Sequence, residues 1–279
     1  MVDPAVALTR VRLQLAYDGT GYSGWARQRD RATVQGDLET ALSEIDPRIG
    51  SVVCAGRTDA GVHARMQVVH VDVPADTWLS RGPDGLVRHL NRLTDDRIQI
   101  HAAGAAAPGF DARFSALSRT YAYRICDDSA SWDPLTRHWV TRHRTTLDVT
   151  AMASAAQALV GEHDFTAFCR PREGASTVRR ILRLDVRRDR RRRVVVTVEA
   201  DAFCHSMVRS LVGALVAIGE GRRGTSWLAT VLAAAERDSS IQVMPPEGLV
   251  LEVVTYPPDE MVGQRAAATR RVRGPVSGS

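Results

Sequence analysis

The chain has 279 residues, of which 44% are hydrophobic and 25% charged, a composition typical of a globular protein with a substantial core. No apolar run approaches the roughly 18 residues of a membrane span, and we expect neither a signal peptide nor contact with a membrane. The formal net charge is +5 and all 37 basic residues are arginines. Because the guanidinium group binds phosphate oxygens in pairs, this charge favours nucleic acid as a partner.

The first half of the chain predicts the order βαββαβ. Alternating apolar and polar residues indicate strands, and apolar residues at helical spacing behind Thr33, placed as an N-cap, indicate a helix. The expected elements are a strand at 11–19, a helix at 33–45, strands at 51–56 and 67–73, a helix at 84–93 and a strand at 97–103. This is the order of a split βαβ unit.

The second half predicts the same order again. The expected elements are a strand at 119–126, a helix at 147–161, a hairpin of 178–188 and 193–203 around an Arg-rich turn at 188–192, helices at 206–219 and 226–237, and a strand at 248–256. We therefore predict an α+β fold of two tandem βαββαβ (ferredoxin-like) halves. They are expected to form a mainly antiparallel sheet with helices on one face and a central active-site cleft.

The domain boundaries follow from this repeat. The N-terminal half is expected at residues 1–107 and the C-terminal half at 108–256, with the joint near the Ala- and Gly-rich stretch 102–114. Residues 257–279 are polar and Arg-rich, and we predict a disordered tail.

Cysteine and histidine usage limits the chemistry. The cysteines are far apart in sequence and form no CxxC pair, and the eight histidines form no HxH or HExxH pair. We expect reduced thiols in a cytoplasmic protein, without a disulfide framework and without a zinc site. The four cysteines are Cys54, Cys126, Cys169 and Cys204.

The segment GTGYSG, residues 19–24, matches GxGxxG directly after a strand, the position of a dinucleotide-binding fingerprint. That fingerprint needs a helix that opens at the third glycine, so that its amides and dipole meet the pyrophosphate. Here the helical spacing begins only near Val34. We reject nucleotide binding and expect these glycines to shape an exposed loop with closely approaching backbone.

The segment CAGRTDAGVHARMQVVHVDV, residues 54–73, places Arg57, Thr58 and Asp59 on a Gly-flanked loop between two apolar runs. One interpretation is a turn, because Asp and Gly close turns through side-chain hydrogen bonds and positive φ. The other is a carboxylate displayed for chemistry with a guanidinium beside it. The local pattern favours the turn and leaves the second interpretation open.

Elimination of reaction classes strengthens the second interpretation. The sequence has no clustered metal ligands, no GxSxG serine and no cysteine in a nucleophilic context. A glycosidase needs two carboxylates, and only Asp59 is conspicuous. One loop carboxylate with arginines and a few aromatics remains, a set that can bind and attack an electron-poor carbon without metal or redox help.

The loop also carries a resemblance to a known family. AGRTDAGVHA resembles the signature loop of the TruA family of tRNA pseudouridine synthases, and five further blocks resemble that family in the same order over most of residues 11–256. These blocks are YDGTGYSGWARQ, ARFSALSRTYAYRI, HDFTAFC, DAFCHSMVRSLVGALVAIGEG and PPEGLVLEV.

The resemblance implies a role for each matching residue. Asp59 matches the nucleophile that helps to break the N-glycosidic bond of a uridine, whose base then reattaches through C5; whether the carboxylate adds to ribose or to uracil stays open. Arg209 matches the arginine that pairs with this carboxylate, and Tyr121 the tyrosine that stacks on the target base. Arg57 matches the arginine that holds the target nucleotide out of the RNA stack. By itself Tyr121 is a strand aromatic that could fill the core, and Arg209 a helix residue among apolar neighbours.

Further residues are candidates for contact with RNA, although an arginine is by default a solvated surface charge and a strand leucine is by default core. The candidate phosphate contacts are Arg27, Arg65, Arg113, Arg119 and the run 187–193, and Leu249 is expected to pack near the uracil. The histidines are expected to pack or to form hydrogen bonds rather than to act as acids or bases; these are His63, His70 and His205.

As a whole the resemblance implies a cytoplasmic isomerase, without cofactor or metal, that converts uridine to pseudouridine in the anticodon stem-loop of tRNA at positions 38, 39 and 40. It also implies a homodimer. One alternative is a catalytically silent RNA-binding protein of the same fold, in which Asp59 does no chemistry. A second is a nucleotide-dependent oxidoreductase, which depends on GTGYSG alone.

Overall fold

The computed structural model describes residues 7–170, 176–234, 236 and 238–272. The chain divides into two compact units. The first unit consists of residues 1–117 and 253–279, and the second of residues 118–252. The change from one unit to the other comes after the predicted joint at 102–114, and the C-terminal residues return to the first unit.

The first unit has the predicted order of elements, βαββαβ. Its sheet has the order β4-β1-β3, with the short β2 paired to β3, and these pairs are antiparallel. The strands are β1 (Leu8–Tyr17), β2 (Val53–Cys54), β3 (His63–Pro74) and β4 (Ile98–Ala105).

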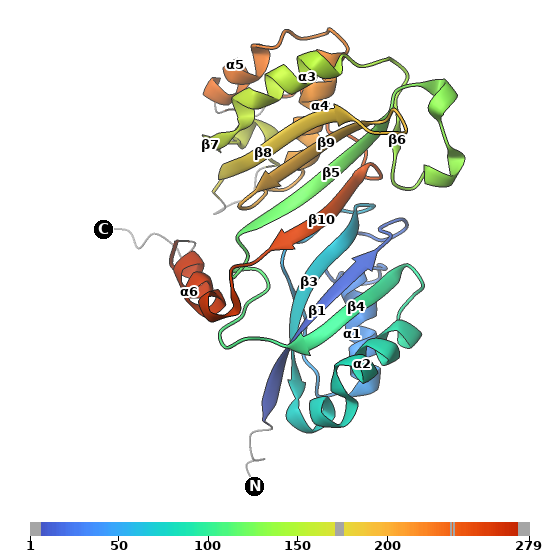
Figure 1. Cartoon of the computed structure of the whole chain (residues 1–279), viewed down its shortest axis with the longest axis vertical. Coiled ribbons are helices and arrows are strands. Elements are labelled where there is room, and N and C mark those ends of the chain that lie inside the picture. Colours follow the sequence, from blue (N-terminus) through green and yellow to red (C-terminus); the bar gives the residue numbers. More distant parts are fainter. Residues whose placement is uncertain (1–6, 171–175, 235, 237, 273–279) are drawn as a thin grey trace. The chain divides into compact units, whose positions relative to one another are not determined.

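Two helices, α1 (Val34–Ile45) and α2 (Ala75–Leu93), lie side by side against this sheet (Figure 1). The Thr33 side chain caps α1 as predicted, because its Oγ1 accepts from the Gly36 N–H at 3.2 Å. The core between helices and sheet consists of alternate residues of β1 and the apolar faces of both helices: Val11, Leu13, Leu15, Leu38, Leu42, Leu86 and Leu90.

Helix α2 begins earlier than the predicted helix at 84–93 because it is two helical segments joined by a kink. At the kink Gly82 has φ 64°, in the left-handed region that glycine tolerates. Pro83 then fixes the start of the second segment, since its missing N–H costs nothing in a first helical turn. Because Gly and Pro normally interrupt helices, the sequence pattern did not predict the first helical segment.

The C-terminal segment is ordered further than predicted. A 3₁₀ turn, η5 (Asp259–Met261), leads into helix α6 (Val262–Val272), where the sequence predicts a disordered tail from residue 257. The Ser115 hydroxyl donates to the Val262 carbonyl at 2.9 Å, and Arg270 forms an ion pair with the buried Asp111 at 2.6 Å. These tertiary contacts stabilise a helix whose own composition is polar. The rest of the predicted tail, 273–279, lies outside the described residues.

The second unit is built on a sheet with the order β10-β5-β9-β8-β7. The pairs β5–β9, β8–β9 and β7–β8 are antiparallel, whereas β6 pairs with β5 in parallel. Two of the short strands, β6 and β7, are not predicted. The strands are β5 (Ser118–Cys126), β6 (Thr141–Arg142), β7 (Gly161–Asp164), β8 (Val178–Arg188), β9 (Val194–Ala200) and β10 (Leu249–Thr255).

The helices of the second unit are α3 (Val149–Ala156), α4 (Met207–Gly219) and α5 (Trp227–Ala234), and α3 packs against both α4 and β8 (Figure 1). The predicted hairpin is present, with an Arg-rich turn between β8 and β9. Short 3₁₀ turns complete the unit: η1 (Ser129–Ser131), η2 (Pro134–Thr136), η3 (Gln157–Leu159) and η4 (Thr166–Phe168).

One expectation about the cysteines is wrong. Cys169 and Cys204 form a disulfide, with their Cα atoms 5.7 Å apart. The two cysteines are separated by 35 residues in sequence, so no local motif indicated that they pair. In the structure the end of η4 and the loop before α4 lie next to each other. Cys54 and Cys126 are free and buried.

Candidate functional site

Asp59 lies in the loop between β2 and β3, and its side chain is half-buried. The Val62 N–H donates to the Asp59 carbonyl at 3.2 Å, and Gly61 has φ 75°, so the residue does open a turn. The turn and the displayed carboxylate are therefore compatible interpretations, because the turn uses the main chain of Asp59 and its side chain stays partly accessible.

The glycines of residues 19–24 hold this loop from one side. The Trp25 N–H donates to the Thr58 carbonyl at 3.0 Å. A Cβ on Gly24 would lie 2.9 Å from the same carbonyl oxygen, and Gly24 has φ 97°. No helix opens at Gly24, since α1 begins at Val34, so the structural context of a dinucleotide fingerprint is missing. The close backbone approach expected for GTGYSG is present.

Buried polar groups hold the loop from the other side. The Tyr17 hydroxyl lies 2.9 Å from Thr58 Oγ1, in a buried contact. Gln67 Nε2 donates to the Tyr17 hydroxyl at 3.3 Å and to the Gly56 carbonyl at 2.8 Å, and Gln67 has no exposed surface. Sequence reasoning missed Gln67, although a glutamine directly before the apolar pair Val68–Val69 of a strand is the signal that could have found it.

The arginines near the loop differ in their surroundings. Arg57 is exposed and forms no ion pair with Asp59 among the described residues. Arg65, on β3, is exposed. Arg27 is exposed but paired with the buried Glu39 at 3.1 Å, and Glu39 also accepts from the Val52 N–H. Part of the Arg27 charge is therefore balanced within the protein.

The remaining first-unit candidates are one arginine and two histidines. The exposed Arg113 has its guanidinium 5.3 Å from the Phe114 ring, and Arg270 stacks on the same ring at 5.2 Å. His70 is buried and its Nδ1 accepts from the Ala112 N–H at 2.9 Å, while burial lowers its pKa. His63 Nδ1 likewise lies 3.0 Å from the Gly19 N–H. Both histidines therefore have the hydrogen-bonding roles expected of them.

In the second unit, β5 presents two tyrosines with different surroundings. Tyr123 has no exposed surface, and its hydroxyl donates to the Pro245 carbonyl at 2.8 Å and lies 2.7 Å from Thr141 Oγ1. Tyr121 is 7% exposed and meets the Phe203 ring edge to face at 5.1 Å. Tyr123 is therefore a core residue, whereas the Tyr121 ring has an aromatic neighbour that orients it. Sequence reasoning missed Phe203.

Arg209 stands out in α4. In this fully described helix it is the one residue that is not buried. Its Nε donates to the Met244 carbonyl at 2.6 Å, and the Met244 N–H donates back to the Arg209 carbonyl at 3.2 Å. These two hydrogen bonds fix the Arg209 side chain against the segment that precedes β10. Leu249, the first residue of β10, is 5% exposed.

Arg119 is not a surface charge. It is 6% exposed, and its Nη1 donates to the Asp201 carbonyl at 2.8 Å. Of the run 187–193, Arg188 pairs with the buried Asp127 at 2.7 Å and Arg193 with Asp189 at 2.7 Å. These arginines have internal partners that the sequence pattern did not reveal.

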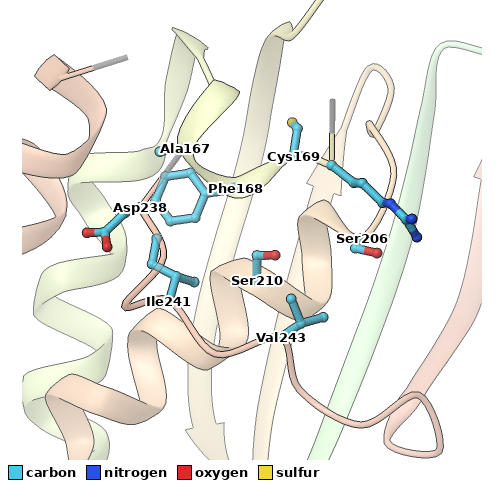
Figure 2. A pocket seen from close by; sticks show the side chains of 9 residues that line it. Ala167, Phe168, Cys169, Ser206, Ser210, Asp238, Ile241 and Val243 are labelled. Carbon is cyan, nitrogen blue, oxygen red and sulfur yellow. The ribbon is translucent and has the colours of Figure 1, made fainter. Parts of the chain in front are cut away.

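A cavity of about 360 Å³ opens at the N-terminal end of α4 (Figure 2). Phe168 and Cys169 line it from the end of η4, Ser206 and Ser210 from α4 and its approach, and Asp238 from the segment after α5. No motif pointed to it, because its lining comes from three separate stretches of the second unit. Arg170, Ala167, Ile241 and Val243 complete the lining.

The described residues hold no group of three or more His, Cys, Asp or Glu side chains that could bind a metal ion. In the same part of the chain no helix has the length and apolar character needed to cross a membrane. Of the predicted site residues, Asp59 lies in the first unit, and Tyr121 and Arg209 lie in the second.

Comparison with known proteins gives a consistent result. A family model described as tRNA pseudouridine synthase matches residues 15–115 and 155–257. The chain is 54% identical over 274 residues to a tRNA pseudouridine synthase A from Frankia casuarinae, covering 98% of each chain. It is 50% identical to a protein of the same name from Streptomyces griseus, covering 95% of this chain and 94% of the relative. A relative from Mycobacterium leprae is 40% identical, with 95% of each chain covered.

Proposed function

Because this chain belongs to the tRNA pseudouridine synthase family and isomerises uridine in tRNA, we propose that Asp59 is the nucleophile and that the target uridines are positions 38, 39 and 40 of the anticodon stem-loop. The observation that carries the proposal is the way Thr58, directly before Asp59, is held by its carbonyl and its side chain. Such support fixes a carboxylate in a partly exposed position, as a nucleophile requires.

The reaction needs little besides a positioned carboxylate. The N1–C1′ bond of uridine breaks, a C5–C1′ bond forms, the proton on C5 is lost and N1 gains a proton, so substrate and product are isomers. The Asp59 carboxylate adds either to C1′ of the ribose, from which it leaves as C5 bonds to that carbon, or to C6 of the uracil, from which it leaves after the C5–C1′ bond has formed. In both routes the carboxylate must be ionised when the base is bound.

The other site residues are assigned by their chemistry and by the family resemblance. Arg209, with Nε bonded to the Met244 carbonyl, is proposed to pair with Asp59. Tyr121 is proposed to stack on the target base, and the exposed Arg57 to take the place of the extruded nucleotide. Leu249 is proposed to pack near the uracil. The predicted central cleft and the phosphate contacts of Arg27, Arg65, Arg113 and Arg119 stay part of this proposal.

Tritium release from tRNA labelled at uracil C5 tests the chemistry, because formation of the new carbon–carbon bond expels the C5 hydrogen. We expect release by the wild type and none by Asp59→Asn, a change that keeps the side-chain shape and removes the charge. Binding of the same tRNA should persist in the variant. Release by Asp59→Asn at the wild-type rate would exclude Asp59 as the nucleophile.

The same assay separates the alternative, a catalytically silent RNA-binding protein, because that protein would bind tRNA without any release.

We further propose that the enzyme acts in the cytoplasm as a homodimer, as the family resemblance implies. Light scattering at micromolar concentration should then give twice the monomer mass, and a monomer mass with full activity would contradict the dimer.

A further inference from the structure

Three arginines and a histidine gather on the outer face of α2, and we name them the α2 cationic cluster: Arg81, Arg88, His89 and Arg92. The three arginines are exposed and His89 is half-buried. Arg81 Nη1 lies 2.9 Å from His89 Nδ1, and Arg92 Nη2 lies 2.9 Å from His89 Nε2. Two guanidinium groups therefore converge on one imidazole from its two nitrogens.

The kink of α2 creates this arrangement. Arg81 ends the first helical segment, and the turn at Gly82 brings it back beside the second. A Cβ on Gly85 would lie 3.8 Å from the Arg81 Cβ and 4.0 Å from Arg88 Nη2, so Gly85 lies beside both arginines. In the second segment Arg88 and Arg92 are four residues apart and share a face.

The core-facing side of the same segment is different. Leu86 and Leu90 are buried against the sheet, which leaves the cluster on the solvent side of the helix. The cluster consequently adds nothing to the hydrophobic core, and its like charges repel one another in the absence of a counter-ion.

The cluster has donors without matching acceptors. A neutral imidazole has one N–H and one acceptor nitrogen, so it can accept from only one of the two guanidinium groups. Desolvation and the charges of Arg81 and Arg92 lower the pKa of His89, which keeps the ring neutral at pH 7. The other guanidinium then faces an N–H.

Within the described ranges, no carboxylate pairs with Arg81, Arg88 or Arg92. The first turn of the same helix shows the usual arrangement, because Asp76 there is paired with Arg48 at 2.9 Å. The cluster thus brings several guanidinium hydrogen-bond donors close together without a carboxylate of the protein to accept from them.

We propose that the α2 cationic cluster binds the phosphodiester backbone of the tRNA substrate, as a contact made by a different element from the loop that carries Asp59. A phosphate group offers several acceptor oxygens at once, so it satisfies the guanidinium groups that the imidazole cannot. The inference rests on tRNA as the substrate. RNA is favoured over an acidic protein as the partner because the tRNA substrate already brings a row of backbone phosphates. Contacts with these phosphates position the RNA without reading its sequence.

The test compares two triple variants that remove the same charge. The first carries Arg81→Gln, Arg88→Gln and Arg92→Gln. The control carries Arg180→Gln, Arg183→Gln and Arg222→Gln, three half-exposed arginines that pair with Glu162, Asp185 and Glu220. Binding of unmodified tRNA is measured by anisotropy over a series of salt concentrations, and tritium release is measured at saturating tRNA.

We expect the cluster variant to weaken tRNA binding about ten-fold or more, and to lower the slope of log K against log salt by about one for each arginine lost. The control should change the slope by much less, because its arginines already have counter-ions. Release at saturating tRNA should persist in both. An unchanged slope in the cluster variant, or the same change in both variants, would overturn the proposal. Absence of release by the wild type would instead contradict the proposed isomerase function, and the binding comparison would keep its meaning.

Discussion

The hydroxyl of Tyr17 and the Oγ1 of Thr58 lie 2.9 Å apart in a buried contact. Thr58 directly precedes Asp59 in the chain. Tyr17 ends β1, and Thr58 belongs to the loop after β2, so this bond ties the loop to the central strand of the first unit's sheet. The Tyr17 hydroxyl also accepts from Gln67. The position of Asp59 thus depends on a polar network inside the core.

Tyr17→Phe removes this hydroxyl and leaves the ring in place. We expect a loss of about 1 kcal/mol in the free energy of unfolding, since one buried hydrogen-bond partner disappears from each neighbour. We also expect kcat for tRNA to fall more than KM changes, because the carboxylate loses its fixed position while RNA contacts remain. Urea unfolding and tritium-release kinetics measure both. An unchanged kcat in a destabilised variant would show that Tyr17 supports the fold alone.

Gly24→Ala places a methyl group against the loop of Asp59. Its Cβ would lie 2.9 Å from the Thr58 carbonyl oxygen, at a φ of 97° that L side chains rarely adopt. We expect destabilisation of about 1–3 kcal/mol from the backbone conformation, together with a strong loss of tritium release. Gly50→Ala is the matched control, because a Cβ there has no heavy atom within 4 Å, and it should keep wild-type activity and stability. Equal effects at both positions would contradict a specific role for Gly24.

The lowered pKa of Asp46 leads to a prediction about how the free energy of unfolding changes with pH. Hydrogen bonds from Arg48, and a further one from the Thr77 hydroxyl, outweigh burial and hold the pKa of the Asp46 carboxyl well below its usual range. A carboxyl with a lowered pKa in the folded state adds stability above its unfolded pKa, near 4, and loses it as the pH falls through the folded value. Asp46→Asn should therefore cost about 1–3 kcal/mol at pH 7. The difference from wild type should shrink below about pH 4.

Urea unfolding of both proteins at pH 7, 5, 4 and 3 measures this difference. A gap between wild type and Asp46→Asn that stays constant down to pH 3 would show that the charge of Asp46 does not contribute.

The Cys169–Cys204 disulfide predicts a labelling pattern. Denatured, unreduced protein should take up two thiol labels, on Cys54 and Cys126, and four after reduction. Because the bond closes a loop with a sequence separation of 35 residues, reduction should lower the free energy of unfolding by about 3–4 kcal/mol. Intact-mass spectrometry and urea unfolding check the two outcomes. Four labels without a reductant would contradict the disulfide.

The sequence was most informative where local chemistry decides local structure. Thr33 was recognised as a helix cap because its hydroxyl has one obvious use at that place. Asp59 was left between two interpretations because the hydrogen bonds that hold its loop, made to Thr58, come from Tyr17 and Trp25, far away in the chain. The family resemblance, rather than any local signal, selected the chemistry.

The features that sequence reasoning missed all depend on tertiary contacts. Arginine is usually a surface residue, but Arg119 donates a hydrogen bond to a backbone carbonyl inside the second unit. The polar helix α6 is stabilised by an ion pair to Asp111 and by the buried Val262, neither of which its own periodicity reveals. The short strand β7 has no apolar alternation, and only the edge of β8 gives it hydrogen-bond partners.

The C-terminal strand end and α6 also determine when the first unit can be completed during synthesis. The Tyr256 hydroxyl donates to the Ala112 carbonyl at 2.6 Å, and Ser115 donates to Val262. A ribosome must therefore translate the whole second unit before it supplies the residues that close the first. The N-terminal domain of a nascent chain usually folds first. In this chain the unit that carries Asp59 is begun first and finished last, so an incomplete translation product holds Asp59 on an unfinished scaffold.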